Sequence, residues 1–367
     1  MAAVRMAGDY LVRMQLEDGS FHYSYDPVED RASRRAYNIV RHAGTVFSLF
    51  ELYGATREAR YLDAARRGVK YLKTRFRPAR EKGAVYVLDN DGKAKLGAVG
   101  LALLALARQI ELDPGSADRK SANRLAKMIL VMQQEDGSFI SYYPIRGDEP
   151  RGSVSLYYPG EAILGLMHLF KAISDYRILE AARRGADYLI ESQRKMDRLP
   201  SDAWLIQALE ALHKTGREQK SNNQKSNNQK YVDQKHADQK YADHALKLAE
   251  RMMAEQYTAS DPAGYAGGFG PGPPRSTPAA ARAEGLLAAY RIARSIADPR
   301  AARFAEALKA SARFQLSQQF NADSNHKLPN PERARGGFRE SLTSMRIRID
   351  YVQHNISSLL GIAYTLY

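Results

Sequence analysis

The stretch Asn38-Ile-Val-Arg41-His42-Ala-Gly-Thr45 sets four polar side chains into a segment that also carries Ile39, Val40, Val46, Phe47, Leu49 and Phe50. Their spacing of i, i+3, i+4 and i+7 places all four on one face of a helix. The same spacing recurs near the other end of the chain, in Asp350, Gln353, His354 and Ser357. Helices so rich in apolar residues are expected to be buried, and buried polar groups need water or polar partners. The two stripes therefore predict a polar lumen, or contact with each other where a ring of helices closes.

Segments with helical periodicity alternate strictly between two kinds along the chain. One kind is amphipathic and charged, at 3–16, 57–76, 116–134, 176–193, 241–256 and 299–319. The other is apolar and rich in small residues, at 36–53, 96–110, 158–174, 202–214, 278–296 and 350–366. Alternating exposed and buried helices joined by short links are typical of a double ring with the apolar set inside. The sequence therefore predicts an all-α fold, an (α/α)6 toroid of twelve helices, in a single domain over residues 1–367.

A turn motif repeats at the ends of the charged helices. Gln15-x-x-Asp18-Gly-Ser-Phe21 is copied as Gln133-x-x-Asp136-Gly-Ser-Phe139, with degenerate copies at 188–193 and 314–318. A Gly after the Asp ends the helix in a tight turn, onto which the aromatic ring packs. These turns resemble the QW-type repeats of terpene cyclases and prenyltransferases. The helical alternation resembles that of the six-hairpin glycosidases and sugar epimerases.

Two acidic motifs separate these branches of the resemblance. Terpene cyclases of this shape carry Asp-x-Asp-Asp, others carry a metal-binding Asp-Asp-x-x-Asp, and this sequence has neither. The resemblance therefore implies a toroid of the carbohydrate-active kind. No His-x-x-x-His or His-Glu-x-x-His pair occurs, and the glycine-rich loops lack the Lys-Ser or Lys-Thr of a phosphate loop. Neither a metal nor another cofactor is expected.

The composition of the chain limits which ligands and binding partners are expected. The chain has no cysteine, which excludes disulfides, thiolate nucleophiles and Cys-ligated zinc. The sequence has no run of about 18 apolar residues, so no membrane span is predicted. No signal peptide precedes the first helix, which favours the cytoplasm, although a removed leader would leave secretion open. The net charge of +14 favours a polyanionic partner, or reflects only a solvated, Arg-rich surface. Without a nucleic-acid recognition motif, the expected partner is an acidic oligo- or polysaccharide. The oligomeric state is not predicted.

Three segments interrupt the helical pattern. Residues 217–240 contain Gln-Lys at a period of five in a Ser-, Asn- and Lys-rich context, which predicts a disordered insert between two helices. Two irregular loops, 264–275 and 320–344, precede inner helices and are expected at the mouth of the ring. Their glycines allow close backbone approach to a ligand, or serve ordinary turns. Strand signal is weak and local, and it predicts a small hairpin around 83–92.

Four carboxylates near the starts of the apolar helices are candidate catalytic groups. They are Glu161, Asp202, Glu284 and Asp350. Paired carboxylates serve as acid and base in glycoside hydrolysis. Simpler roles compete with catalysis: Asp202 suits a helix N-cap, Glu161 suits a helix dipole, and Asp350 suits a structural ion pair. Glu284 lies too deep in its helix for capping, so a role in the lumen is expected. Asp350 with His354 would alternatively be an orienting acid with a base.

A second set of residues suits substrate binding at the same mouth. It comprises Asn38, Arg41, His42, Tyr157, Tyr158, Trp204, Gln353 and His354. Aromatic faces stack on sugar rings, and charged and amide groups bond hydroxyls. His42 and Trp204 are equally explained as core residues, and an Arg41–Asp350 pair would be a clasp that closes the ring.

Three functions follow from these residues. The leading hypothesis is a glycoside hydrolase acting on an acidic oligo- or polysaccharide through paired carboxylates. The second is a uronate lyase or epimerase, with a His or Tyr base and an Asn or Arg group that neutralises the substrate acid. The third is a glycan-binding or scaffold toroid without catalysis, in which the two stripes only close the ring.

Overall fold

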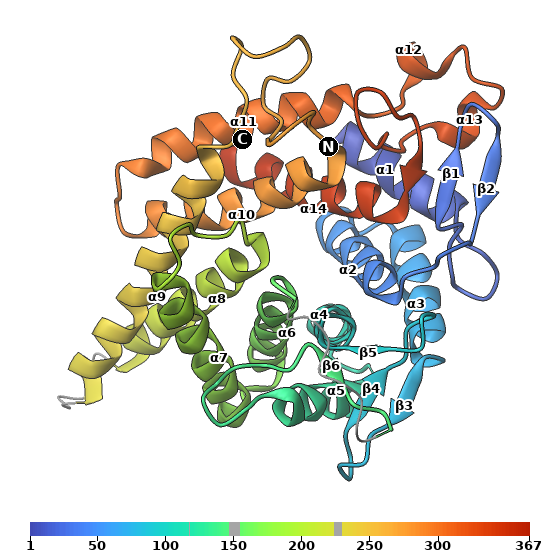
Figure 1. Cartoon of the computed structure of the whole chain (residues 1–367). Helices are drawn as coiled ribbons and strands as arrows, with labels where there is room; N and C mark the ends of the chain where they lie inside the picture. Colours follow the sequence, from blue (N-terminus) through green and yellow to red (C-terminus); the bar gives the residue numbers. More distant parts are fainter. Residues whose placement is uncertain (117, 147–154, 224–229) are drawn as a thin grey trace.

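The computed structural model describes residues 1–116, 118–146, 155–223 and 230–367, and within them twelve long helices form two concentric rings (Figure 1). The outer ring contains α1 (Ala2–Arg13), α3 (Ala59–Lys73), α5 (Arg119–Met132), α7 (Tyr176–Arg194), α9 (Lys230–Met253) and α11 (Arg300–Ser317). The inner ring contains α2 (Ile39–Thr56), α4 (Leu96–Leu112), α6 (Tyr158–Ile173), α8 (Ala203–Asn223), α10 (Ser276–Ser295) and α14 (Ile349–Leu366). The predicted (α/α)6 toroid is confirmed.

The inner ring closes on itself. Each inner helix packs against the next, and α14 packs against both α10 and α2. The tightest approach joins α4 and α6, where a Cβ on Gly165 would lie 2.6 Å from the carbonyl oxygen of Gly100. Only glycine lets two helix backbones come this close. Close packing of Ala-, Leu- and Gly-rich faces thus makes the buried core, which runs around the ring between its two layers.

The outer ring is held by one contact repeated four times. A glutamine at the end of an outer helix donates through Nε2 to a carbonyl oxygen of the following outer helix. The four bonds are Gln15 to Ala64 at 2.9 Å, Gln133 to Ala181 at 2.9 Å, Gln256 to Ala307 at 2.9 Å and Gln319 to Ala3 at 2.8 Å. The last bond joins α11 to α1 and closes the outer ring.

Two of these turns carry long insertions that hide them in the sequence. Each glutamine bridges to a phenylalanine, in the pairs Gln15–Phe21, Gln133–Phe139, Gln256–Phe269 and Gln319–Phe338. The degenerate copies expected at 188–193 and 314–318 are therefore not the equivalent positions. Gln193 instead lies 2.8 Å from His244 Nε2, and Gln318 accepts from Arg339.

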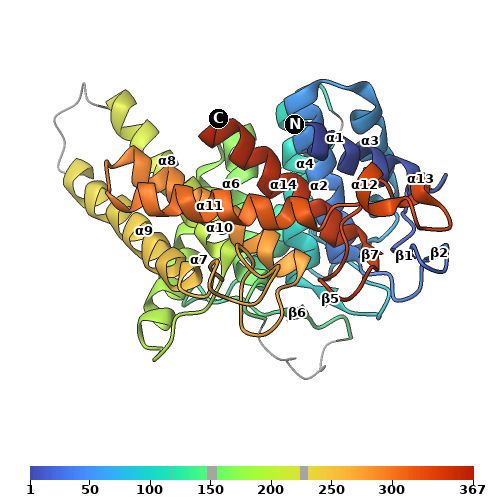
Figure 2. The same ribbon diagram turned by 90° about the horizontal axis from the view of Figure 1, so that it is seen from above.

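Short strands lie on the face where the inner helices begin (Figure 2). β1 (Ser24–Asp26) pairs antiparallel with β2 (Arg31–Ser33) and with β7 (Ile347–Arg348), which leads directly into α14. β5 (Ala94–Lys95) pairs with β6 (Tyr142–Tyr143). In the expected hairpin, β4 (Val85–Val87) pairs with the preceding β3 (Phe76–Pro78), and Leu88 bridges to Ala94. The short helices α12 (Ala322–Asn325) and α13 (Pro331–Ala334) lie in the loop before α14.

The insert lies between α8 and α9. In the part that the structure describes, α8 continues to Asn223 and α9 begins at Lys230, so both ends of the insert extend helices. Residues 224–229 lie outside the described residues, and the disordered insert expected over 217–240 stays a prediction.

Candidate active site

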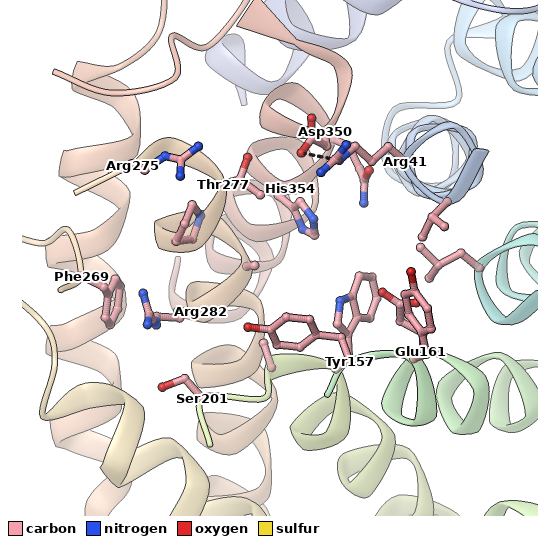
Figure 3. A pocket seen from close by; sticks show the side chains of 18 of the residues that line it. Arg41, Tyr157, Glu161, Ser201, Phe269, Arg275, Thr277, Arg282, Asp350 and His354 are labelled. Atoms are coloured by element: carbon pink, nitrogen blue, oxygen red, sulfur yellow. Dashed lines mark ion pairs between the residues drawn. The ribbon is translucent and has the colours of Figure 1, made fainter. Parts of the chain in front are cut away.

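A cavity of about 560 Å³, here called the front cavity, opens where the inner helices begin (Figure 3). Every inner helix contributes to its lining, mostly from its N-terminal turns. Of the candidate residues, nine line it: Asn38, Arg41, Tyr157, Tyr158, Glu161, Trp204, Asp350, Gln353 and His354. Three others, His42, Asp202 and Glu284, lie outside its lining.

The two polar stripes meet at the wall of this cavity. Arg41 Nε on α2 lies 3.2 Å from Asp350 Oδ2 on α14 (Figure 3). Arg348 binds the same carboxylate through two nitrogens, at 2.6 and 2.9 Å. The charge of this carboxylate is therefore already compensated by two guanidinium groups. This geometry fits the ring-closing ion pair that the sequence left open better than a catalytic role for Asp350.

Glu161 is the acid that lines the front cavity without an ion pair among the described residues. It is 5% exposed, in the first turn of α6, and its Oε2 has no hydrogen-bond partner in the described part of the chain. Gly97 of α4 makes room for it, since a Cβ there would lie 2.2 Å from Oε2. Burial, helped by nearby Asp202, raises the pKa of Glu161 to about 8. Its carboxyl group is therefore mostly protonated at neutral pH and able to donate a proton.

Asp202 caps α8. It is fully buried, and Oδ1 accepts a hydrogen bond from Leu205 N at 3.0 Å. Burial raises the pKa of Asp202 to about 7. Its neighbours Ser201, Ala203 and Trp204 line the front cavity. The carboxylate thus lies behind the wall, as the N-cap interpretation expects.

His354 and Glu284 form a buried pair between α14 and α10. His354 Nδ1 lies 3.0 Å from Glu284 Oε1, and the imidazole points into the front cavity (Figure 3). Burial alone would lower the pKa of His354, but the Glu284 carboxylate reverses this and raises it. Burial raises the pKa of Glu284, against the opposing effect of His354. The carboxylate that contacts His354 is therefore that of Glu284, and not that of Asp350 as the i, i+4 spacing suggested.

Aromatic rings surround the pair. The indole of Trp204 lies edge-to-face with the His354 ring, with 5.9 Å between centroids. Tyr157 lines the cavity with 47% of its surface exposed, and burial raises the pKa of its neighbour Tyr158 to about 12. Both tyrosines are therefore neutral hydroxyl groups at physiological pH. Trp204 lies at the cavity, which favours its binding interpretation over that of a pure core residue.

The irregular loop 264–275 lies at the mouth, as the sequence predicted. It supplies Phe269, Gly270, Pro271, Pro273 and Arg275 to the lining. Arg282 of α10 stacks over Phe269 at 5.6 Å and pairs with Glu255 at 3.0 Å. Ser201, Phe269, Arg275 and Thr277 were not among the candidate site residues. Only their position before an inner helix marked them in the sequence.

His42 lies in the core and not in the site. It is fully buried, with Nδ1 2.7 Å from the Tyr37 hydroxyl and Nε2 2.9 Å from the Gly68 carbonyl oxygen on α3. Burial lowers the pKa of His42 to about 4, so the ring is neutral. This corrects the expected substrate-binding role and agrees with the core interpretation.

The described residues offer neither a metal site nor a membrane span. No group of three or more His, Asp or Glu side chains is placed so that it could hold a metal ion. In the same part of the chain, no helix has both the length and the apolar character that crossing a bilayer requires.

Comparison with known proteins gives structural relatives and no sequence family. No protein-family model matches the chain, and no curated protein matches its sequence. Cellobiose 2-epimerase from Bacillus thermoamylovorans B4167 superposes with a TM-score of 0.68 at 11% identity, covering 97% of each chain. An α-1,6-mannanase from Salegentibacter sp. HEL1_6 has a TM-score of 0.66 at 13% identity, covering 99% of this chain and 98% of the mannanase. An unsaturated glucuronyl hydrolase specific for heparin has a TM-score of 0.64 at 13% identity, covering 99% and 96%. The chain therefore shares the (α/α)6-toroid fold of these proteins.

Proposed function

We propose that the protein is a carbohydrate-active enzyme that transfers a proton on a sugar bound in the front cavity, as a sugar epimerase or isomerase. The observation that carries this proposal is the His354–Glu284 pair facing a cavity that also holds a protonated acid, Glu161. The similarity to cellobiose 2-epimerase and to D-mannose isomerase supports it.

The chemistry follows from the proton positions. When His354 Nδ1–H donates to Glu284, Nε2 is free to take the proton from the carbon next to the sugar carbonyl. The C–H electron pair then forms a C=C bond, and the carbonyl oxygen takes a proton from Glu161 to give an enediol. His354 Nε2 returns the proton to the opposite face of that carbon after the enediol turns in the cavity, while the hydroxyl proton passes back to Glu161, and the sugar is epimerised. Return of the proton to the neighbouring carbon, with the proton of the other enediol hydroxyl passing to Glu161, isomerises it. Polar groups of Asn38, Arg41 and Gln353 would hold the hydroxyls.

Glycoside hydrolysis is the second candidate, and Glu161 favours it. An acid with a raised pKa is what protonation of a leaving oxygen requires. The mannanase and the glucuronyl hydrolase among the structural relatives support this alternative. The base is harder to assign, because Asp350 is bound by two arginines and Asp202 is a helix cap. We therefore place hydrolysis second, although paired carboxylates led the sequence-based hypotheses.

An acidic substrate is a separate part of the proposal. The front cavity is lined by Arg41, Arg275 and Arg282, which would suit a uronate. Each of them already pairs with a carboxylate, of Asp350, Glu340 and Glu255 respectively. Neutral sugars and uronates therefore both belong in the first substrate panel.

The test is incubation in D2O with cellobiose, mannose, α-1,6-mannotriose and an unsaturated glucuronyl disaccharide, followed by NMR and mass spectrometry. Proton transfer predicts an epimer or isomer with deuterium at the reacting carbon, and loss of both in His354→Gln. Release of a reducing end without carbon-bound deuterium would instead establish hydrolysis. Binding of a sugar without any product would support the non-catalytic alternative and overturn the proposal.

A further inference from the structure

A second cavity, here called the rear cavity, lies at the opposite end of the lumen. Its volume is about 500 Å³, and most of its lining comes from the middle and C-terminal parts of inner helices, with Trp204, Gln207 and Gln353 added from the N-terminal parts of α8 and α14. Tyr364, 62% exposed, lies at its rim, so the cavity opens to solvent on the face away from the front cavity. Its polar lining comprises Glu51, Arg108, Gln207, Glu284, Arg291, Gln353 and Ser357.

A thin wall separates the two cavities. Trp204 and Gln353 line both of them, so these side chains form the partition. His354 lines the front cavity and Glu284 lines the rear one. Because these two groups are 3.0 Å apart, their hydrogen bond passes through the partition. The base thus faces the site of the sugar, and its carboxylate partner faces the other opening.

Polar groups continue from Glu284 towards the rear mouth. Glu51 of α2 accepts a hydrogen bond from Ser357 of α14 at 2.5 Å. Burial, with a contribution from the charge of Glu284, raises the pKa of Glu51 to about 7. Arg108 and Arg291 line the same space and pair with Glu111 at 2.8 Å and Glu210 at 3.5 Å. A lumen lined in this way is suited to hydrogen-bonded water, whereas an apolar space would stay dry.

We propose that the rear cavity is a solvent route through which Glu284 exchanges protons with water while a sugar closes the front cavity. The catalytic use of this route rests on the proposed function, but the route itself exists in the protein without a bound sugar. When His354 Nε2 takes a proton from the sugar, Nδ1 passes its own proton to Glu284 Oε1. Glu284 then releases that proton to water in the rear cavity, and the reverse transfer restores the starting state.

The absence of cysteine from the chain permits a direct test. Ser357→Cys places one thiol in the rear cavity, and Ala281→Cys places one in the front cavity at a similarly half-buried position. A benzyl methanethiosulfonate reagent then plugs one cavity at a time, and a reductant removes the plug. Each unmodified variant is the control for its own modified form.

The readout is solvent exchange of the Nδ1–H of His354, the proton that faces Glu284, in histidine-labelled protein by ¹⁵N NMR, with His354→Gln identifying the signal. We expect the rear plug to slow this exchange about tenfold or more and the front plug to leave it nearly unchanged. Slowing by the front plug alone, or an unreactive thiol in Ser357→Cys, would overturn the inference. Because no sugar is present, failure of the proposed enzymatic activity cannot produce either outcome.

Discussion

Replacing Glu161 by glutamine should stabilise the folded protein at neutral and alkaline pH while abolishing turnover. The carboxyl group is buried, lines the front cavity and has no ion-pair partner among the described residues. Such a group is costly to ionise in place. Glutamine has nearly the same shape as glutamate but carries no charge. The substitution therefore removes the proton donor and should raise the free energy of unfolding.

The magnitude follows from the pKa. Burial moves the pKa of Glu161 from 4.5 to about 8, and each pKa unit corresponds to about 1.4 kcal/mol. The folded state therefore binds this proton more tightly than the unfolded state does. The contribution of Glu161 to the free energy of unfolding is fully present below pH 4.5 and falls by about 1.4 kcal/mol per pH unit up to pH 8. The wild type should lose about 3 kcal/mol by pH 7 through this group, and Glu161→Gln should lose none of it.

Urea unfolding at pH 5, 7 and 8.5 measures this difference. The stability advantage of Glu161→Gln should be below about 1 kcal/mol at pH 5 and grow with pH. Glu255→Gln is a control for which we expect the opposite sign. Glu255 pairs with Arg198, Arg251 and Arg282, so removing its charge should destabilise the protein. Parallel stability curves for wild type and Glu161→Gln would refute the assignment of a buried, protonated acid.

Three further outcomes can be measured. His354→Gln should lower turnover about 100- to 10,000-fold while Gln still donates to Glu284, as measured by deuterium incorporation into the sugar. His42→Ala should lower the free energy of unfolding by about 2–4 kcal/mol, because it removes two buried hydrogen bonds and packing, with KM unchanged. Gly336→Ala should cost about 3 kcal/mol and Gly92→Ala about 1 kcal/mol by thermal unfolding. Both have φ near +80°, but only at Gly336 would a Cβ meet backbone, at Met6. Equal costs for the two glycines would contradict the role of that turn in closing the ring.

The fold was predictable because periodicity reports which face of each helix is buried. The segment expected at 158–174 is α6, Tyr158–Ile173, and the one expected at 350–366 is α14, Ile349–Leu366. Burial of a stripe of apolar side chains is a local consequence of sequence, so the two kinds of helix could be separated. The hidden turns at Gln256 and Gln319 were missed because insertions of unrelated loops lengthen the spacing to their phenylalanines.

The sequence predicted where the site lies, but only part of the contacts between its residues. The converging helix starts placed nine candidate residues at one cavity. The Arg41–Asp350 pair was anticipated, but the other contacts between inner helices could not be derived, because they depend on the relative register of helices far apart in the chain. His354 was matched with Asp350 on its own helix, whereas its partner is Glu284, 70 residues away. The same limitation hid the partition formed by Trp204.

The two polar stripes differ in how they face the lumen, and this difference explains the error at His42. On α14 the stripe follows the lumen along its length: Asp350 lines the front cavity, Gln353 both cavities and Ser357 the rear one. On α2 only part of the stripe faces the lumen, and the rest faces the outer ring. Successive residues of a helix point about 100° apart, so Arg41 faces the cavity while His42 faces α3 and bonds Gly68. A polar stripe therefore identifies a helix that borders the lumen, and only packing against the outer ring decides which of its edges meets a ligand.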